Sequence, residues 1–245
     1  MIFAAGLGTR LKPITDTLPK ALVPVCGKPL LYHCIHRLKE AGYNQLVINI
    51  HHFPEQIREY VLGQDWGVEI GLSDESSRLL ETGGGLAHAR EMLEGPRPFL
   101  VHNVDIVSNL DFAWLRRETR PWALATLLVS ERKTSRYLLF GDDMRLKGWT
   151  DIRTGEVRSP YPDLGVNSCR RYAFSGIHNI SPDIFRAFDR MQVPERFPIM
   201  DFYLHACALY PIYGVVAENL KLVDVGKFDS LPEAENTCRE ILFQD

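Results

Sequence analysis

Four charged residues, far apart along the chain, are of the types that handle phosphate chemistry. Arg10 and Lys20 lie within the first thirty residues, whereas Asp105 and Asp224 each follow an apolar run. Arginine binds phosphate oxygens as a forked donor, and lysine binds them as a compact point charge. Two carboxylates at strand ends can converge on a Mg²⁺ ion that also binds phosphate oxygens. These residue types indicate a site for a nucleoside triphosphate and Mg²⁺.

A glycine-containing loop precedes the two cations. The apolar run 1–5 breaks into GLGTR at 6–10, and glycine lets backbone N–H groups approach a phosphate closely. Neither the GxGxxG dinucleotide fingerprint nor the GxxxxGK[ST] P-loop is present. Prolines at 13, 19, 24 and 29 also prevent a helix from following promptly. We therefore expect an extended cationic loop, and an NAD-dependent oxidoreductase is disfavoured.

Alternating strands and helices must position these residues. Apolar and amphipathic runs predict strands at 1–5, 45–50, 68–72 and 99–103, and helices at 29–41, 54–62 and 85–93. This alternation predicts an α/β fold with a Rossmann-like, doubly wound, mostly parallel sheet. Ligands of such sheets bind beyond the carboxyl ends of the strands, where the glycine loop and Asp105 fall.

The second half of the chain is less regular and richer in strands. Strands are predicted at 123–130, 137–140, 147–150, 171–180 and 221–225, and helices at 183–190, 198–209 and 230–243. Gly141-Asp142-Asp143 predicts a hairpin between the second and third of these strands. Because no linker or repeat interrupts the chain, we expect a single domain over residues 1–245. Residues 123–180 would then contribute the substrate side.

Composition narrows the classes of function. The chain has 245 residues, 45% of them hydrophobic, and a net charge of −3. A general nucleic-acid binder needs a basic face, which this charge argues against. No apolar run reaches the roughly 18 residues of a membrane span, and the five cysteines form no CxxC pair. We expect a cytoplasmic protein that binds neither nucleic acid nor membrane. Its oligomeric state is left open, and a homo-oligomer is possible.

Several segments together resemble a known enzyme family. GLGTRLKPITDTLPKALVPVCGKPLL at 6–31 is similar to the signature of the sugar-1-phosphate nucleotidyltransferases. Further matches are LLETGGGLAHA at 79–89, FLVHNVD at 99–105, YAFSGIHNISP at 172–182 and KLVDVGKFDSLPEAE at 221–235. Within the family, these segments look most like N-acetylmuramate-1-phosphate uridylyltransferases and the related mannose- and heptose-1-phosphate guanylyltransferases.

The resemblance implies substrates and a role for each site residue. The enzyme would join a nucleoside triphosphate to a sugar 1-phosphate and release pyrophosphate. Arg10 would contact the β- and γ-phosphates, Lys20 would lie near the α-phosphate and the sugar phosphate, and Asp105 and Asp224 would bind Mg²⁺. The nucleotide-binding positions would be Ala5, Gly6, Gly8, Thr9, Gly83 and Gly84. The sugar-binding positions would be Asn103 and Gly176.

Two local features bear on the nucleobase and on the metal. Three glycines at 83–85 lead into the predicted helix, which begins at the third of them, and would let the backbone approach a flat base. The family usually has Asn-Gly-Asp where this chain has Asn103-Val104-Asp105, and valine disfavours a positive φ at that position. The path of the chain between Asn103 and Asp105 is therefore left open.

The sequence leaves open which nucleobase and which sugar the enzyme would use. The chain has no Glu-Lys-Pro in its second half, which disfavours glucose-1-phosphate thymidylyl- and uridylyltransferases, and no hexapeptide repeat, which disfavours a bifunctional acetyltransferase. A uridylyltransferase for N-acetylmuramate 1-phosphate is favoured. The rivals are a guanylyltransferase for mannose or heptose phosphate, a phosphocholine cytidylyltransferase, and a catalytically silent nucleotide-sugar sensor.

Overall fold

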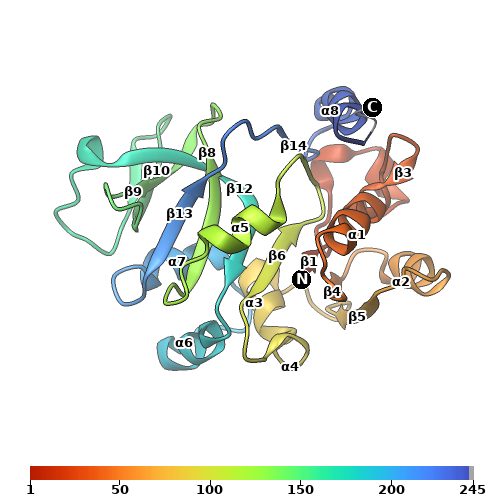
Figure 1. Ribbon diagram of the computed structural model, residues 1–245, viewed down its shortest axis with the longest axis horizontal. Helices are drawn as coiled ribbons and strands as arrows, with labels where there is room; N and C mark the ends of the chain where they lie inside the picture. The colour runs from red at the N-terminus through yellow and green to blue at the C-terminus, as the bar shows by residue number, and fades with distance from the viewer. Residues whose placement is uncertain (243–245) are drawn as a thin grey trace.

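A mixed sheet of ten strands runs through the molecule (Figure 1), and its strands follow the order β11-β10-β9-β12-β6-β1-β4-β5, with β8 beside β12 and β13 beside β8. The computed structural model describes residues 1–242. The strands are β1 Ile2–Phe3, β2 Pro24–Val25, β3 Lys28–Pro29, β4 Gln45–Ile50, β5 Glu69–Asp74, β6 Phe99–Asn103, β7 Ile106–Ser108, β8 Ala125–Ser130, β9 Arg136–Phe140, β10 Leu146–Asp151, β11 Glu156–Arg158, β12 Arg170–Ile180, β13 Ile212–Val216 and β14 Leu222–Asp224.

Eight α-helices and several short 3₁₀ turns connect the described strands. The helices are α1 Leu30–Glu40, α2 Pro54–Leu62, α3 Glu81–His88, α4 Arg90–Leu93, α5 Phe112–Glu118, α6 Asp183–Met191, α7 Ile199–Ala206 and α8 Leu231–Leu242. The last position of the helix predicted at 230–243 lies outside the described residues. No helix in the described part of the chain has the length and apolar character needed to cross a membrane.

The N-terminal half of the sheet is parallel and doubly wound. Ile2 of β1 lies beside Ile48 of β4 on one side and His102 of β6 on the other, and β5 continues the sheet beyond β4. The chain thus moves outward from β1 in one direction and then returns to place β6 on the opposite side. The order of the strands reverses between β1 and β6, and ligands of open α/β sheets bind at such a point.

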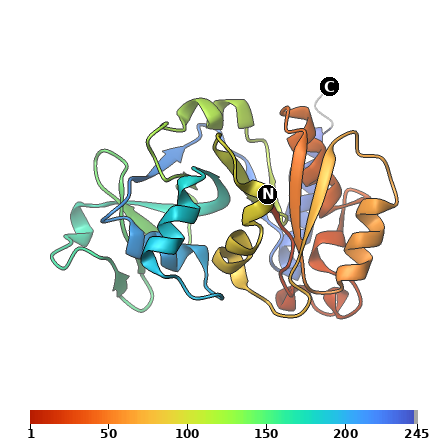
Figure 2. The same cartoon turned by 90° about the horizontal axis from the view of Figure 1, so that it is seen from below.

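Both faces of this half are covered by helices, as the sequence alternation predicts. Along β1, Ile2 packs on the face of α1, α2 and α8, whereas Met1 and Phe3 pack on the face of α3, α6 and α7. Figure 2 shows α1 and α2 on one side of β4 and β5, with α3 and α4 on the other side of the sheet. Alternating side chains of β1 therefore serve two hydrophobic cores.

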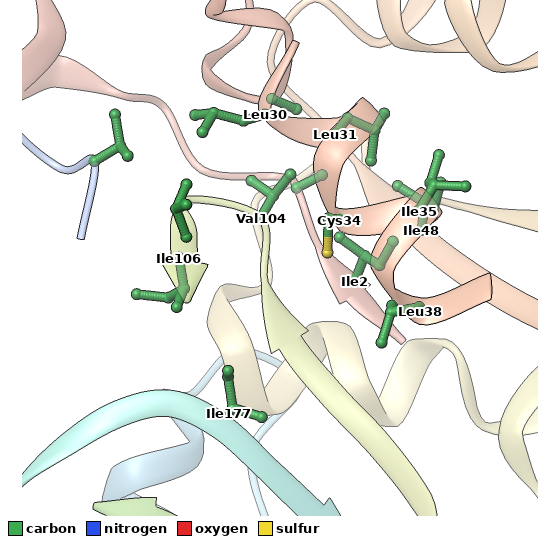
Figure 3. Close-up of a cluster of buried hydrophobic side chains, with 14 of the residues drawn as sticks. Ile2, Leu30, Leu31, Cys34, Ile35, Leu38, Ile48, Val104, Ile106 and Ile177 are labelled. Carbon is green, nitrogen blue, oxygen red and sulfur yellow. The ribbon is translucent and has the colours of Figure 1, made fainter. Parts of the chain in front are cut away.

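Helix α1 holds the central strands in place. Its apolar face is fully or almost fully buried and points toward Ile2 and Ile48 (Figure 3). This face consists of Leu30, Leu31, Cys34, Ile35 and Leu38. Burying one such aliphatic side chain contributes about 1.5–3 kcal/mol. The packing of α1 thus gives the loops after β1 and β6 a rigid base.

The second half of the sheet is mainly antiparallel. Strand β12 pairs antiparallel with β6, β8 and β9, and β9 and β10 form the hairpin predicted around residues 141–143. Among the described strands of this half, only β13 runs parallel to its neighbour, β8. The α/β, Rossmann-like class is confirmed, with its parallel part confined to the centre and N-terminal half. A bulge in β12 between Phe174 and His178 holds Gly176 at φ +73°.

The helix predicted at 85–93 is wrong in its bounds. Helix α3 begins at Glu81, contains all three glycines, and ends before a second short helix, α4. The amides of Gly83 and Gly84 donate to the carbonyl of Phe197, over 2.8 and 3.1 Å. Glycine is needed here for close packing, since a Cβ on Gly83 would lie 2.2 Å from the Phe197 ring. Tertiary contacts therefore override the low helix propensity of glycine.

Candidate active site

A pocket of about 370 Å³ opens at the carboxyl ends of β1 and β6, where the strand order reverses. This volume falls within the range of small-molecule sites. The segments 3–6 and 103–105 form its base at these strand ends, and Glu81 and Thr82 of α3 form one wall. Its remaining lining residues are Lys20, Asn49, Glu75, Leu79 and Pro198.

Lys20 and Asp105 form an ion pair in this pocket. Lys20 begins a 3₁₀ turn after Pro19, and its side chain is only 11% exposed. Its Nζ donates to the Asp105 carboxylate, which directly follows β6 and is itself largely buried. A buried lysine requires such a partner, because an unpaired charge is costly to remove from water. The pair fixes one positive charge at the wall of the pocket.

The two aspartates predicted as metal ligands lie side by side. Strand β14 pairs antiparallel with β7, which places Asp224 beside Ile106. The amide of Val225 donates to the carbonyl oxygen of Asp105 over 2.8 Å. This small two-stranded sheet therefore joins the C-terminal part of the chain to the end of β6.

Asp224 has the environment of an incomplete ligand site. Its Oδ1 is buried and has no hydrogen-bond partner within residues 1–242. Burial raises the pKa of Asp224 and the charge of Asp105 raises it further, whereas Lys20, Arg132 and Arg10 lower it. A buried carboxylate without a partner, next to a second carboxylate, is unfavourable unless a cation binds.

These two carboxylates fit Mg²⁺ in their chemistry. Oxygen donors suit this ion, which is usually bound by one or two carboxylates and completes its shell with water and substrate phosphates. Among residues 1–242, no group of three or more histidine, cysteine or acidic side chains is arranged to hold a metal. Asp105 and Asp224 would accordingly supply only part of the coordination shell.

The glycine loop packs tightly against the turn that carries Lys20. Gly8 has φ +64°, and a Cβ there would lie 2.8 Å from the Thr15 methyl and 3.1 Å from the Lys20 Cβ. The Thr15 hydroxyl donates to the Gly8 carbonyl over 2.8 Å. Glycine is thus required at position 8 for both conformation and space. Ala5 and Gly6 line the pocket, whereas Thr9 lies in the next 3₁₀ turn and is not among the lining residues.

Arg10 extends from this loop toward Asp224. A Cβ on Gly226 would lie 2.9 Å from an Arg10 guanidinium nitrogen and 2.6 Å from Asp224 Oδ1. The absence of a side chain at Gly226 leaves room for both groups beside the backbone. The structure therefore brings Arg10, Lys20, Asp105 and Asp224 into one cluster.

The remaining predicted positions divide between the pocket and its support. Asn103 lines the pocket, and Gly176 packs behind it, with a Cβ position 2.9 Å from the Asn103 amide nitrogen. Gly83 and Gly84 are buried in α3 and are not among the lining residues, whereas Glu81 and Thr82 are. The Thr82 hydroxyl accepts a hydrogen bond from the Ile199 amide at the start of α7.

Val104 occupies the position where the family pattern has glycine. It is 4% exposed and has no positive φ, and its side chain packs against α1 in the cluster of Figure 3. Its amide donates to the Phe3 carbonyl over 3.1 Å. The backbone thus passes from β6 to Asp105 in a conformation that valine accepts, and the valine contributes to the core.

A buried pair of polar side chains in the pocket wall, Asn49 and Glu75, was not predicted from the sequence. Asn49 Oδ1 accepts from the Ala4 amide over 2.7 Å, and its Nδ2 donates to Glu75 Oε1 over 2.7 Å. The other Glu75 oxygen accepts from the Leu80 amide. Burial raises the pKa of Glu75. The pair ties the end of β1 to the segment before α3, and an asparagine inside the apolar strand QLVINI was its only sequence signal.

Arg132 was also missed. It lies just after β8, and its guanidinium donates to the Phe174 carbonyl on β12 over 3.1 Å. Its charge acts on Asp224, as noted above. The residue is part of none of the matched segments, so no motif pointed to it.

Comparison with known proteins identifies the family of this site. The model of the family described as Nucleotidyl transferase matches residues 1–141, which include Arg10, Lys20 and Asp105. The chain belongs to the nucleotidyl transferase family. The enzyme class predicted from the sequence is thereby confirmed.

Two relatives show how far the likeness of this nucleotidyl transferase extends. It is 34% identical over 201 residues to N-acetylmuramate alpha-1-phosphate uridylyltransferase of Neisseria meningitidis, covering 82% of each chain. It is 37% identical over 115 residues to mannose-1-phosphate guanylyltransferase catalytic subunit beta of Danio rerio, covering 46% of this chain and 32% of that protein. The first likeness spans most of both proteins, and the second spans a shared part.

The fold of this nucleotidyl transferase recurs in solved structures. A putative glucose-1-phosphate thymidylyltransferase from Bacillus anthracis superposes with a TM-score of 0.80 at 20% identity, covering 100% of this chain and 96% of that one. At this identity the likeness concerns the fold alone. It supports the α/β, Rossmann-like assignment for the whole length of the chain.

Proposed function

We propose that the chain is a sugar-1-phosphate nucleotidyltransferase that forms an NDP-sugar and pyrophosphate, with Mg²⁺ as its cofactor. The observation that carries the proposal is the meeting of Lys20, Asp105, Asp224 and Arg10 at the switch point of the sheet. A site for joining two phosphate compounds needs this combination of cations and oxygen ligands.

N-acetylmuramate 1-phosphate and uridine triphosphate are the substrates that we favour. The support is the relative of that name, because the likeness to it covers 82% of both chains. A mannose- or heptose-1-phosphate guanylyltransferase is the second candidate. The mannose enzyme matches at a similar identity, but over only 46% of this chain.

The reaction is a direct displacement at the α-phosphorus. An oxygen of the sugar phosphate forms a bond to that phosphorus, and the bond to the bridging oxygen breaks, so that pyrophosphate leaves with the electron pair. The attacking group is already an anion at neutral pH, and no general base is needed. Catalysis then rests on positioning two anions and neutralising their charge.

The residues of the pocket and of the charged cluster beside it divide this work. Lys20, held in place by Asp105, would present its charge to the α-phosphate and the sugar phosphate. Arg10 would bind the β- and γ-phosphates and stabilise the leaving pyrophosphate. Mg²⁺ held by Asp105 and Asp224 would supply further neutralisation of phosphate charge. The backbone at Ala5, Gly6 and Gly8 would hold the nucleotide.

The base and the sugar would occupy opposite ends of the pocket. We place the base between the loop after β1 and the wall formed by Glu81 and Thr82, and the sugar beside Asn103. In this arrangement Gly83 and Gly84 act indirectly, because their packing on Phe197 positions that wall. We also place the enzyme in the cytoplasm, and its five free cysteines support a reducing compartment.

The test is a matrix of sugar 1-phosphates against the four nucleoside triphosphates, followed by pyrophosphate release. We expect the highest kcat/KM with uridine triphosphate and N-acetylmuramate 1-phosphate, and none without Mg²⁺. Preference for guanosine triphosphate with mannose or heptose 1-phosphate would establish the second candidate instead. Nucleotide binding without turnover of any pair would indicate a sensor and refute the proposal.

A further inference from the structure

The loop after β1 is anchored at both of its ends. Strand β1 ends just before Ala4, and the segment 3–6 lines the pocket. At the start of the loop, the Ala4 amide donates to Asn49 Oδ1 over 2.7 Å. At its far end, the Gly8 carbonyl accepts from the Thr15 hydroxyl over 2.8 Å. Backbone N–H groups hold a phosphate only when they point at it, so the first anchor sets the direction in which the loop leaves the sheet.

Asn49 makes the first anchor with its side chain. In the pairing of β1 with β4, Asn49 lies beside Phe3, the residue before Ala4. The Ala4 amide can only donate, so the atom that it meets is the carboxamide oxygen of Asn49, and the carboxamide nitrogen donates to Glu75 Oε1 over 2.7 Å. The chain can therefore leave the sheet at Ala4 without an unpaired amide in a buried place.

Glu75 extends this link to α3. Its second carboxylate oxygen accepts from the Leu80 amide, just before the helix, over 3.3 Å. A Cβ on Gly85 would lie 2.5 Å from Glu75 Oε1 and 3.0 Å from Asn49 Nδ2. Helix α3 thus packs directly on the pair, and the first turn of this helix forms the wall where we place the base.

The position of the pair explains it better than stability does. Asn49 is 3% exposed and Glu75 is 1% exposed. Polar groups cost free energy to bury unless they are hydrogen-bonded, and well-packed apolar side chains often stabilise a core at least as well. The bonds that leave the pair run to Ala4 on one side of the pocket and to Leu80 on the other. The pair therefore sets the spacing between these two sides.

We propose that Asn49 and Glu75 are positioning residues for the nucleoside triphosphate, which hold the loop after β1 and the first turn of α3 at the spacing that this substrate needs. The phosphates lie on the loop and the base lies on the wall, so a change in spacing loses one contact or the other. The sugar 1-phosphate, placed beside Asn103 at the end of β6, depends on a different strand. This inference rests on the proposed function, since it concerns the first substrate of that reaction.

An exchange of functional groups tests the pair. In Asn49→Asp combined with Glu75→Gln, the carboxylate at position 49 accepts from the Ala4 amide and from the carboxamide at position 75, whose oxygen accepts from the Leu80 amide. This double variant keeps each bond and the charge of the pair. Asn49→Asp alone sets two carboxylates against each other, and the carboxamide of Glu75→Gln alone offers its oxygen to only one of two donors.

Calorimetry with uridine triphosphate and Mg²⁺, without a sugar phosphate, gives the Kd of the nucleotide, and steady-state kinetics gives kcat and both KM values. Guanosine triphosphate takes its place if the substrate matrix selects it. In Asn49→Ala and in each single variant, the Kd and KM of the nucleotide should rise about 5–100-fold, because a buried polar group loses its partner. The double variant should return to within about threefold of the wild type, and the KM of the sugar 1-phosphate should change less than about threefold throughout.

Asn179→Ala is the matched control for the loss of a buried asparagine. Asn179 is 4% exposed and donates to the Thr119 hydroxyl over 2.7 Å, but it is not among the residues that line the pocket. This variant should lose thermal stability as Asn49→Ala does and keep both KM values within about threefold of the wild type. A rise in the nucleotide KM as large as that of Asn49→Ala would assign the effect to general destabilisation and overturn the inference.

Two results for the pair itself would also overturn it. One is a double variant that binds the nucleotide no better than the single variants, and the other is an equal rise in both KM values. If Asn49→Ala does not fold, the comparison of Glu75→Gln with the double variant decides in the same way.

The binding measurement separates this inference from the proposed function. A wild type that binds no nucleoside triphosphate would refute both. If the wild type binds the nucleotide but turns over no sugar phosphate, the proposed function is refuted, and the Kd values still decide the inference. An active wild type with an unchanged Kd in Asn49→Ala and Glu75→Gln refutes the inference alone.

Discussion

Replacing Gly83 with alanine tests whether the glycines of α3 serve close packing. A Cβ at this position would lie 2.2 Å from Phe197 Cε2 and 2.8 Å from the Phe197 carbonyl oxygen. Carbon atoms in contact normally lie about 3.5–4.0 Å apart. Helix propensity alone predicts that alanine stabilises a helix by about 1 kcal/mol. The two effects have opposite signs, so the direction of the measured change decides between them.

The size of the loss follows from what must move. The overlap can be relieved only by separating α3 from the segment around Phe197, which costs about 1–3 kcal/mol as overpacking. Separation also weakens the hydrogen bonds from Gly83 and Gly84 to the Phe197 carbonyl, at about 0.5–1.5 kcal/mol each. After subtraction of the propensity gain, we expect a loss of about 1–5 kcal/mol. A loss of about 3 kcal/mol corresponds to a fall in Tm of about 6–12 °C for a chain of this size.

Urea denaturation of Gly83→Ala measures this change directly. Gly95→Ala is the matched control, because a Cβ there meets no atom within 4 Å, and its stability should stay within about 1 kcal/mol of the wild type. The KM of the nucleotide should also rise in Gly83→Ala, since Thr82 lies in the pocket wall. A variant as stable as the wild type, or more stable, would refute the packing explanation.

Three further predictions concern charge. Lys20→Ala should lower kcat at least about 100-fold in a pyrophosphate-release assay; a near-normal kcat would remove Lys20 from the site. Asp224→Asn should raise the denaturation midpoint of the metal-free protein, because it removes a buried charge that lies beside Asp105. The same variant should raise the Mg²⁺ concentration needed for half-maximal rate at least about tenfold. An unchanged Mg²⁺ requirement would count against Asp105 and Asp224 as the ligand pair. Burial lowers the pKa of His102 to about 4 and that of His178 to about 3. Below about pH 6.5 the unfolded chain therefore takes up protons on these two histidines that the native protein does not. The free energy of unfolding should fall toward pH 4 by up to about 1.4 kcal/mol per pH unit for each histidine. Equal stability at pH 7 and pH 5 would contradict this.

The fold was predicted best for elements whose bounds follow from their own residues, without help from distant contacts. The predicted bounds of β4 and α2 match the structure at both ends, because a continuous apolar run enters the parallel sheet and a proline opens the helix. The short strand β7 was missed, since three residues carry too little periodicity, and so was β13. Their places in the sheets depend on partners distant in the sequence.

The part of the site that could be predicted consists of residues that directly follow a strand of the parallel sheet. Asp105 could be placed because parallel strands present their carboxyl ends at one edge of the sheet. Asn49 and Arg132 could not. Asn49 acts through a buried hydrogen bond to Ala4, and Arg132 meets its hydrogen-bond partner, the Phe174 carbonyl, only once β8 and β12 have paired. The helix predicted to start at residue 85 left Gly83 outside it, because the contact that requires glycine there comes from Phe197, in the segment before α7.

Pyrophosphate release and NDP-sugar formation, followed by mass spectrometry with purified wild type and Lys20→Ala, test the central claim most directly. With Mg²⁺, uridine triphosphate and N-acetylmuramate 1-phosphate, the wild type should form one equivalent of pyrophosphate per UDP-sugar, and the variant should form neither at a comparable rate. The account would be contradicted by a wild type that binds the nucleotide but yields no NDP-sugar with any sugar 1-phosphate, or by a variant as active as the wild type.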